Sequence, residues 1–222
     1  MKNSNIYSIW KPPGITSYDV IRKIKKTYNN LDKIGHCGTL DPFAEGILLV
    51  CTGSKVKESS DYMKLSKTYI ADFVFGKETD TLDSTGTVFK ENFKNNILKK
   101  ELIVKTIDKY IGSYVQSPPY FSAKKINGIR MYELARNNIF IRPKGPEVKI
   151  HSLNAISLKD NKLKIEIKCG AGMYVRSLAR DIAYDLNTYA FVDALKRVKI
   201  GNFDIEKSIH YNDIEKNELF IF

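Results

Sequence analysis

Side chains able to do chemistry gather in one glycine-rich segment, Gly35-His-Cys-Gly-Thr-Leu-Asp-Pro-Phe-Ala-Glu-Gly46. Its three glycines and one proline predict a shaped loop that holds Asp41 next to His36 and Thr39, and such loops present side chains to ligands. A carboxylate there suits nucleophilic attack or electrostatic stabilisation. The residues alone also allow a purely structural interpretation, because Asp-Pro commonly starts a turn and a histidine can be packed into a loop.

Two further candidates lie later in the chain, and each also has a structural interpretation. Tyr69 follows Lys67-Thr on a predicted strand, where alternate side chains face the core, so it can be a half-buried aromatic residue. Arg176 follows Gly170-Ala-Gly172 at the start of a predicted helix, where a guanidinium can pair with a carboxylate. The same arginine can equally be a surface residue of that helix.

Positive charge is in excess and is concentrated in one segment. The chain has 36 Lys and Arg against 25 Asp and Glu, a net charge of +11, which attracts polyanions but can also serve solubility alone. Between Ser117 and Lys149, cations outnumber the two glutamates and alternate with aromatic residues, a composition that favours RNA binding. The cations of this segment are Lys124, Lys125, Arg130, Arg136, Arg142, Lys144 and Lys149.

Hydrophobic periodicity and turn residues predict the elements that must position these side chains. Strands are expected at Ile6–Trp10, Ile47–Val50, Lys67–Phe75, Glu147–Leu158, Leu163–Cys169 and Ala190–Ile200. Helices are expected from an N-cap at Ser17 to about Tyr28, and over Ser54–Lys64, Asn92–Ile111, Met131–Asn137 and Met173–Leu186. Strands and helices mix without regular alternation, so the predicted class is α+β with a mostly antiparallel sheet, in a single catalytic domain of residues 1–222.

The cysteines and the absence of long hydrophobic stretches favour a protein of a reducing compartment. Cys37, Cys51 and Cys169 are widely spaced and lack the paired spacing of a zinc or disulfide centre, which favours free thiols. No hydrophobic stretch has the length of a signal peptide or a membrane span. We therefore expect a cytoplasmic protein that does not bind membranes. A monomer is a separate expectation, which these features do not establish.

Six segments of the chain form a characteristic series. They are Lys11-Pro-Pro-Gly-Ile-Thr-Ser17, Gly35-His-Cys-Gly-Thr-Leu-Asp-Pro42, Lys67-Thr-Tyr69, Thr79-Asp-Thr-Leu-Asp83, Ser117-Pro-Pro119 with Ser122-Ala-Lys-Lys125, and Gly172-Met-Tyr-Val-Arg-Ser-Leu178. In this order and at this spacing, they together resemble the bacterial tRNA pseudouridine synthase B (TruB) family from end to end. The resemblance implies the pseudouridine synthase fold, a central mixed sheet flanked by helices with an active-site cleft.

The resemblance also implies roles for individual residues. Asp41 corresponds to the catalytic aspartate beside a flipped-out uridine, Tyr69 to the tyrosine that stacks on the base, and Arg176 to the arginine that pairs with the aspartate. Substrate-binding positions are implied for His36, Tyr174, Leu195 and Lys125. The implied reaction converts the T-loop uridine of tRNA to pseudouridine with no cofactor and no metal, and the implied partner is the tRNA T-arm.

One departure from the family concerns the C-terminus. Longer members carry a small RNA-binding domain called PUA, whereas about 20 residues follow Phe203, too few for an independent fold. We therefore expect no PUA domain and a weaker or differently shaped grip on tRNA. Two alternatives remain open, namely a tRNA-binding or folding chaperone without catalysis and a pseudouridine synthase for another RNA.

Overall fold

The chain divides into two compact units, each described by itself. The computed structural model describes residues 4–28, 31, 33–92 and 99–216. Unit 1 comprises Met1–Tyr69 and Leu195–Phe222, and unit 2 comprises Ile70–Ala194. Strands β4 (Lys67–Phe75) and β12 (Ala190–Ile200) contribute residues to both units. In the described part of the chain, no helix is long and apolar enough to cross a membrane.

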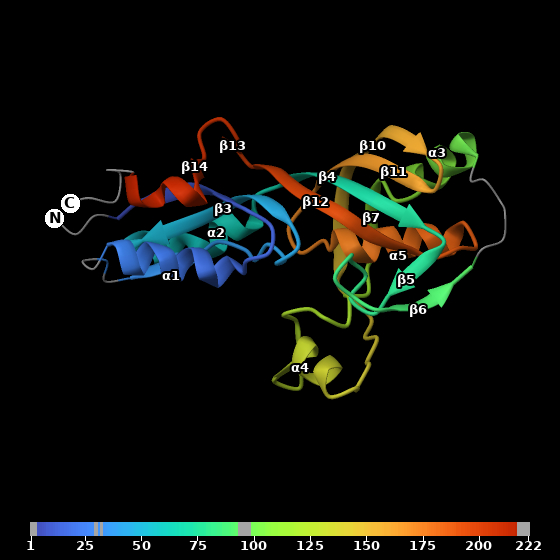
Figure 1. Ribbon diagram of the computed structural model, residues 1–222, viewed down its shortest axis with the longest axis horizontal. Coiled ribbons are helices and arrows are strands. Elements are labelled where there is room, and N and C mark those ends of the chain that lie inside the picture. Colours follow the sequence, from blue (N-terminus) through green and yellow to red (C-terminus); the bar gives the residue numbers. More distant parts are fainter. Residues whose placement is uncertain (1–3, 29–30, 32, 93–98, 217–222) are drawn as a thin grey trace. The chain divides into compact units, whose positions relative to one another are not determined.

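Unit 1 consists of a sheet and of helices that are interspersed with its strands along the sequence (Figure 1). Its own elements are β1 (Ile6–Lys11), α1 (Ser17–Thr27), β2 (Ile34–His36), β3 (Glu45–Thr52), the 3-10 helix η1 (Gly53–Glu58), α2 (Ser59–Lys64), β13 (Phe203–Asp204), β14 (Ile209–His210) and the 3-10 helix η2 (Tyr211–Lys216). β1 and β2 pair antiparallel with β3, while β14 runs parallel to β1 and β12 runs parallel to β3.

The core of unit 1 forms where α1 packs on β1 and β3. The helix buries one apolar stripe, as its 3.6-residue periodicity requires. The buried residues of this cluster are Tyr7, Ile9, Val20, Ile21, Ile24, Leu48, Val50 and Ile214. The predicted strands of this unit are confirmed, and β3 extends beyond the apolar run on which its prediction rested.

Two helix predictions in unit 1 need correction. The N-cap of α1 is Thr16, whose side chain accepts from the Asp19 amide while the Asp19 carboxylate accepts from the Thr16 amide, a capping box. The Ser17 hydroxyl instead donates to the Leu40 carbonyl. The single helix predicted over Ser54–Lys64 is a 3-10 helix followed by α2, a difference in hydrogen-bond pattern that apolar spacing does not reveal.

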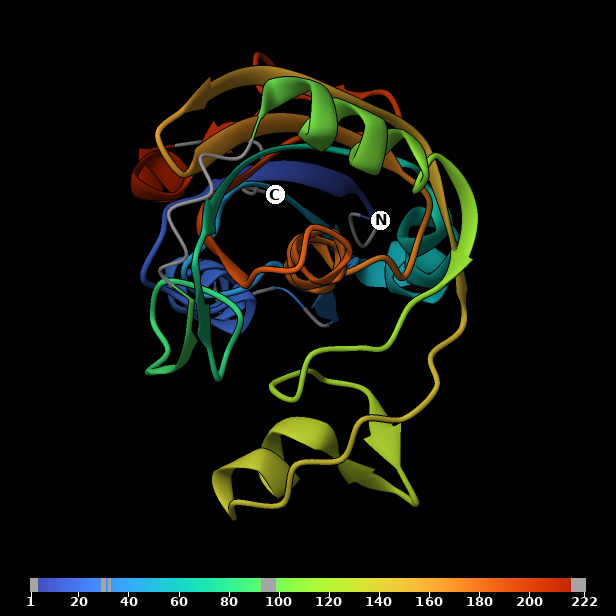
Figure 2. The ribbon, with the colours of Figure 1, turned by 90° about the vertical axis from the view of Figure 1, so that its right-hand side faces the viewer.

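Unit 2 is built on a second group of strands, in the order β12-β4-β11-β10-β7. Its own elements are β5 (Lys77–Thr79), β6 (Val88–Glu91), α3 (Lys100–Asp108), β7 (Gly112–Val115), β8 (Lys125–Ile126), β9 (Ile129–Arg130), α4 (Met131–Arg136), β10 (Glu147–Lys159), β11 (Lys162–Cys169) and α5 (Val175–Asp185). Strands β10 and β11 curve around α5 (Figure 2), and the apolar face of that helix is fully buried. The predicted strands of unit 2 are confirmed.

The predicted helix over Asn92–Ile111 is shorter in the structure. Only Lys100–Asp108 is helical, and the chain then turns before Gly112, whose φ of 107° suits glycine. Residues 93–98 of the prediction lie outside the described residues. The α+β class with a mixed, mostly antiparallel sheet flanked by helices is confirmed.

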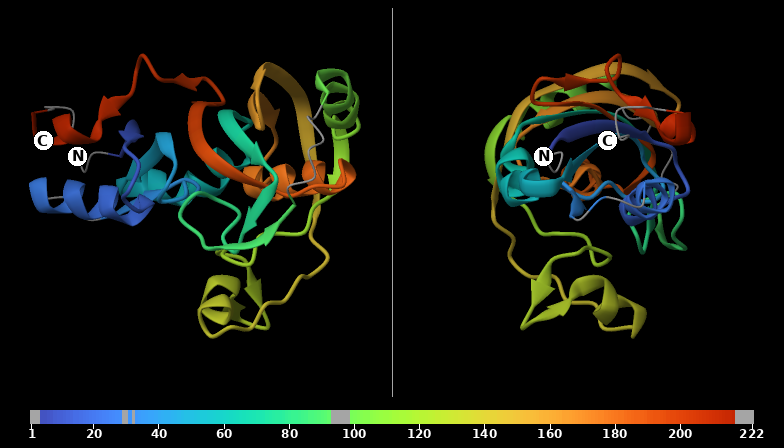
Figure 3. Two further views of the ribbon diagram at one scale, coloured as in Figure 1. Left: turned by 45° about the vertical axis from the view of Figure 1, so that its right-hand side comes forward. Right: turned by 90° about the vertical axis from the view of Figure 1, so that its left-hand side faces the viewer.

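A small lobe, residues 118–142, stands apart from the strands of unit 2 and carries β8, β9 and α4 (Figure 3). The two stretches of chain that lead into and out of the lobe, residues 116–117 and 143–146, lie side by side, and we call them the neck. The Gln116 amide donates to the Pro146 carbonyl over 3.2 Å and the Ser117 hydroxyl donates to the Pro143 carbonyl over 3.0 Å. A Cβ on Gly145 would lie 1.5 Å from the Gln116 carbonyl oxygen, so only glycine allows this backbone approach.

Candidate active site

Asp41 lies in unit 1, in the loop that connects β2 to β3. This Asp41 loop, residues 37–44, ends in a turn in which the Ala44 amide donates to the Asp41 carbonyl over 3.1 Å. The Gly14 amide donates to the Pro42 carbonyl over 2.8 Å, which joins the loop to the segment after β1. Asp41 itself is half-buried. These two backbone hydrogen bonds thus fix the turn that begins at Asp41.

Lys11, the last residue of β1, fastens the Asp41 loop from inside. The side chain is fully buried, and its Nζ, which carries three N–H donors, lies within hydrogen-bond distance of four carbonyl oxygens. Two belong to Pro12 and Ile15, at 2.8 and 2.9 Å, and two belong to Pro42 and Ala44, at 3.3 and 2.7 Å. The ammonium group therefore joins the segment after β1 to the turn that follows Asp41.

The burial of Lys11 also shapes the charge around Asp41. Desolvation lowers the pKa of Lys11 to about 8, and the negative charge of Asp41 is the largest of the influences that oppose this shift. The two groups are therefore close enough to interact electrostatically.

Arg197 on β12 braces the first half of the Asp41 loop. It is 2% exposed, and its guanidinium donates to the carbonyls of Ile47, Thr39 and Gly38 over 2.7, 3.2 and 3.4 Å. A Cβ on Gly46 would lie 2.3 Å from the Arg197 carbonyl oxygen, and the φ of Gly46 is 120°. Glycine at this position lets β12 approach β3 closely enough for the guanidinium to reach the loop.

His36 is the last residue of β2 and lies half-buried beside the same loop. Burial, followed by the positive charge of Arg197, lowers the pKa of His36 below its ordinary value. The imidazole is therefore neutral at neutral pH. Its Nδ1 atom is buried and makes no hydrogen bond within the described residues.

Cys37 and Cys51 flank the base of the Asp41 loop. Both thiols are fully buried, and their sulfur atoms lie 2.9 Å apart in a hydrogen bond. Cys169, in unit 2, is also buried, and all three cysteines are free thiols, as predicted. The described residues hold no cluster of three or more His, Cys, Asp or Glu that could bind a metal ion.

Tyr69 and Leu195 complete the predicted residues of unit 1. Tyr69 lies on the buried face of β4 with 8% of its surface exposed, and Leu195 on β12 is similarly buried. Lys67, two residues before Tyr69, is also buried, and its Nζ donates to the carbonyls of Met63 and Leu65 at the end of α2. The end of α2 and the start of β4 are thereby held together.

Arg176 belongs to unit 2 and lies in the first turn of α5, with 4% of its surface exposed. Its interpretation as a surface helix residue is therefore wrong. The guanidinium donates to the Thr81 carbonyl over 2.8 Å and to the Phe121 carbonyl over 3.2 Å, and it lies 3.5 Å from Asp83 Oδ2. It thus joins α5 to the β5–β6 turn and to the lobe.

Asp83 is a further candidate site residue, because it faces Arg176, and it was not singled out from the sequence. It is 5% exposed, and its Oδ1 accepts hydrogen bonds from the Thr81 hydroxyl, the Thr85 hydroxyl and the Thr85 amide over 2.8, 2.6 and 3.0 Å. These bonds orient the carboxylate that faces Arg176. The signal was present in the motif Thr79-Asp-Thr-Leu-Asp83, which combines carboxylates with threonine hydroxyls in one turn.

The other predicted residues of unit 2 occupy different places. Tyr174 is half-buried and is the N-cap residue of α5, while Lys125 is exposed on β8 of the lobe. Tyr174 and Arg176 are therefore brought together on one helix end, whereas His36 and Asp41 are brought together in unit 1. The pairing of Arg176 with Asp41 stays a prediction.

Solved structures identify the class of fold. The chain aligns with one in the crystal structure of a Cbf5-Nop10-Gar1 complex at a TM-score of 0.73 and 25% identity, covering 97% of this chain and 54% of that one. It aligns with one in the structure of an H/ACA RNP bound to a substrate RNA containing 2'-deoxyuridine at a TM-score of 0.71 and 22% identity, covering 97% and 53%. The chain spans about half the length of these solved chains. The fold is that of pseudouridine synthases.

Sequence relatives identify the family. Residues 25–175 match the model of the TruB family pseudouridylate synthase N-terminal domain. The tRNA pseudouridine synthase B of Fusobacterium nucleatum subsp. nucleatum is 46% identical over 201 residues, which are 90% of this chain and 69% of that protein. The protein of that name from Endomicrobium trichonymphae is 40% identical over 211 residues, 95% of this chain and 91% of that protein. The chain belongs to the TruB family of pseudouridylate synthases.

Proposed function

We propose that the protein is a tRNA pseudouridine synthase that isomerises the T-loop uridine of tRNA after flipping it out of its stack. The relatives named tRNA pseudouridine synthase B, at 38 to 46% identity over at least 90% of this chain, support the enzyme class and the substrate. The observation that carries the catalytic assignment is the Asp41 loop, which two buried cations, Lys11 and Arg197, hold in place.

Asp41 is proposed as the catalytic carboxylate. In the reaction the bond from C1' to N1 of uracil breaks, the base rotates, a new bond forms from C1' to C5, and the C5 proton is lost while N1 regains one. A carboxylate beside the sugar suits this sequence as a nucleophile or as a stabiliser of the charge that develops when the first bond breaks. Neither oxidation nor phosphoryl transfer occurs, so the proposal includes no cofactor.

Tyr69 and Arg176 are proposed as the other catalytic residues. The aromatic face of Tyr69 would hold the detached uracil during rotation, and its hydroxyl would assist removal of the C5 proton. Arg176, already fixed by two carbonyls and Asp83, would pair with Asp41 and favour its charged form. His36, Tyr174, Leu195 and Lys125 are proposed to contact the RNA.

The lobe is proposed to bind the phosphate backbone near the target. Flipping a base costs a few kcal/mol, which stacking and phosphate contacts can offset, and a structured loop is a cheaper substrate than a duplex. On the lobe, Arg130 and Arg136 lie 5.8 and 5.4 Å from the centre of the Tyr132 ring, so cationic and stacking groups are adjacent. This combination suits a single-stranded or looped RNA.

The test is modification of an unmodified tRNA transcript by the purified protein without any cofactor, with pseudouridine mapped by carbodiimide treatment and primer extension. Wild type should give one T-loop pseudouridine. Asp41→Ala should give none while still binding tRNA. The matched control is Asp61→Ala, since Asp61 is an exposed α2 carboxylate that pairs with Lys64.

The outcomes separate the alternatives. Turnover by Asp41→Ala would contradict the catalytic assignment. A folded wild type that binds tRNA without modifying it would favour a tRNA-binding or folding chaperone, and modification only in another RNA would favour a different substrate. The same preparation tests the proposals that the chain acts as a monomer and as a single catalytic domain, by light scattering and limited proteolysis.

A further inference from the structure

Gln116 is a buried amide at the point where β7 leads into the neck of the lobe. It is 1% exposed, and its side chain pairs with the backbone of one residue, Tyr174, at both polar atoms. The Tyr174 amide donates to Gln116 Oε1 over 2.8 Å, and Gln116 Nε2 donates to the Tyr174 carbonyl over 3.2 Å. Nε2 also donates to the hydroxyl of Tyr114, so both polar atoms of the amide are used.

The backbone conformation of Tyr174 explains why an amide side chain fits there. Tyr174 has φ −104° and ψ 114°, an extended conformation, so its N–H and C=O project to the same side, as they do along a β-strand. One glutamine amide presents a donor and an acceptor at the matching separation. The Gln116 side chain therefore pairs with the N–H and C=O of Tyr174 as the backbone of a neighbouring β-strand would.

This pairing matters because Tyr174 begins α5. The helix has no side-chain cap at its N-terminus, and Tyr174 is its N-cap residue. Arg176 follows in the first turn. The position of the Arg176 guanidinium thus depends on where the backbone of Tyr174 is held, and Gln116 holds it without touching Arg176 itself.

A second set of bonds fastens the neck to the same helix. The carbonyl of Ser117 accepts from the Ser177 hydroxyl over 2.8 Å and from Arg180 Nη2 over 3.0 Å. Together with the Gln116 pairing, the neck therefore grips α5 at positions 174, 177 and 180, which lie along one side of the helix. These bonds limit how far the helix start can shift when RNA contacts the lobe.

We propose that Gln116 is a positioning residue of the reaction, which holds the start of α5 so that the Arg176 guanidinium keeps its catalytic place. The inference rests on the proposed function, because the position of the Arg176 guanidinium matters for the rate only if Arg176 takes part in catalysis. A misplacement of about 1 Å at a reacting group can lower a rate on the order of 100-fold. Loss of the Gln116 pairing should therefore lower the catalytic rate more than it weakens tRNA binding, to which Tyr174 is one of several proposed contributors.

The test replaces Gln116 by methionine, which keeps the length of the side chain and removes both hydrogen bonds to Tyr174. Single-turnover rates at saturating tRNA should fall by roughly 10- to 100-fold. The Kd for tRNA should rise by a clearly smaller factor, because Tyr174 is one of several proposed RNA contacts. Hydrogen exchange of the Tyr174 amide should become faster. If Gln116→Met does not fold, Gln116→Asn, which retains the amide but is too short for both bonds, is expected to behave in the same way.

A matched control separates positioning from general stability. Thr106→Val also removes a buried side-chain hydrogen bond in unit 2, from the Thr106 hydroxyl to the Leu102 carbonyl over 2.8 Å, at a helix with no proposed catalytic role. It should lower the melting temperature without lowering the single-turnover rate of the folded protein. A wild-type rate in folded Gln116→Met would overturn the inference.

A double-mutant cycle tests the route through Arg176. If Gln116 acts by placing Arg176, Gln116→Met should lower the rate much less in an Arg176→Lys background than in wild type. Equal fold-losses in both backgrounds would contradict that route. If wild type modifies no RNA, the proposed function fails, whereas the grip of Gln116 on α5 is still read independently from the exchange of the Tyr174 amide.

Discussion

Two buried cations shape the residue environment of Asp41. Lys11 holds the turn after the aspartate and Arg197 holds the residues before it, in each case through backbone carbonyls. A charge buried in this way is stable only when every donor is satisfied. Substitution of either cation therefore disturbs the loop backbone as well as the local electrostatic potential.

The lowered pKa of Lys11 predicts a dependence of stability on pH. With a pKa of about 8 in the folded protein against 10.5 ordinarily, the unfolded chain binds more protons than the folded one between these values. The contribution of Lys11 to the free energy of unfolding should therefore rise with pH over this window, by up to about 3 kcal/mol. Chemical denaturation of wild type and Lys11→Met at pH 7, 8.5 and 10 measures it. A difference between the two proteins that is constant with pH would contradict the assignment.

The close approach at Gly46 gives a second prediction at this scale. Gly46→Ala places a Cβ 2.3 Å from the Arg197 carbonyl oxygen at a φ of 120°, and should destabilise the protein by about 2 to 4 kcal/mol. Gly14→Ala is the matched control, because Gly14 also has a positive φ of 87° but nothing within 4 Å of the added Cβ. Equal losses in melting temperature would mean that backbone strain alone, without the contact to Arg197, accounts for the effect.

At the scale of elements, the longer strands were predictable from the sequence, whereas the short strands β2, β5 to β9, β13 and β14 and the helix ends were not. The strands Lys67–Phe75 and Ala190–Ile200 have the predicted bounds, because their buried and less buried side chains alternate and this alternation is visible in the residue types. The cap of α1 was misplaced by one residue, since Thr16 and Ser17 are both good caps and only the capping box with Asp19 decides between them.

The candidate site was predictable to different extents. Asp41, Tyr69 and Arg176 were recognisable in their motifs, but their surroundings depend on contacts between distant segments. The burial of Arg176 against Asp83 and the carbonyl of Phe121 joins three parts of the chain that periodicity cannot bring together. The same holds for Gln116, whose partner lies 58 residues further along.

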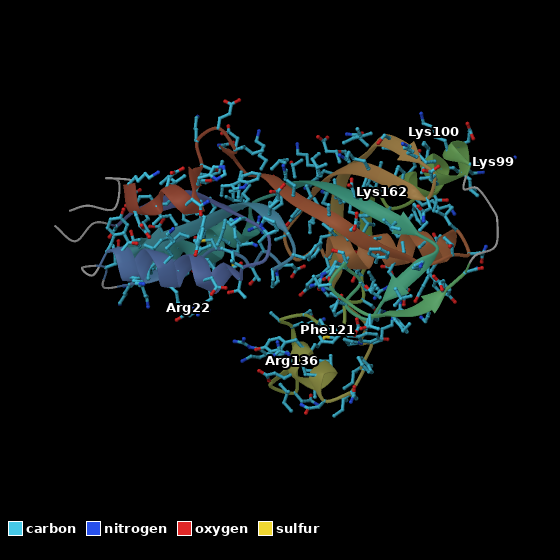
Figure 4. All side chains as sticks on the ribbon, viewed as in Figure 1. Arg22, Lys99, Lys100, Phe121, Arg136 and Lys162 are labelled. Atoms are coloured by element: carbon cyan, nitrogen blue, oxygen red, sulfur yellow. The ribbon has the colours of Figure 1, made fainter. Side chains whose placement is uncertain are left out.

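The lobe carries a prediction of its own. Lys124→Ala combined with Lys125→Ala should weaken tRNA binding and reduce the slope of log K against log salt by roughly 1.5, if each lysine neutralises one phosphate. Lys99→Ala with Lys100→Ala is the matched control, because these lysines start α3, away from the labelled lobe residues Phe121 and Arg136 (Figure 4). Filter binding from about 50 to 200 mM salt measures both pairs. Equal changes in slope would show that the lobe has no special role.

At the scale of the whole molecule, the net charge of +11 predicts a strong dependence of RNA affinity on salt. Raising the salt concentration should increase the KM for tRNA steeply and leave the single-turnover rate at saturating tRNA nearly unchanged, because counterion release affects binding rather than bond rearrangement. Rates measured over a tRNA titration at several salt concentrations test this. A KM that does not respond to salt would mean that phosphate contacts contribute little to substrate binding.

The neck of the lobe has a consequence for how this protein can be altered. Because the Gln116 amide and the Ser117 hydroxyl donate to carbonyls of residues 143–146, both ends of the lobe are fixed, and its length is decoupled from the register of the strands that follow. Doubling the length of such a closed loop costs only about 0.6 kcal/mol of closure entropy. The part of the lobe after Phe121, whose carbonyl holds Arg176, can therefore be rebuilt for a different RNA while the catalytic framework is retained.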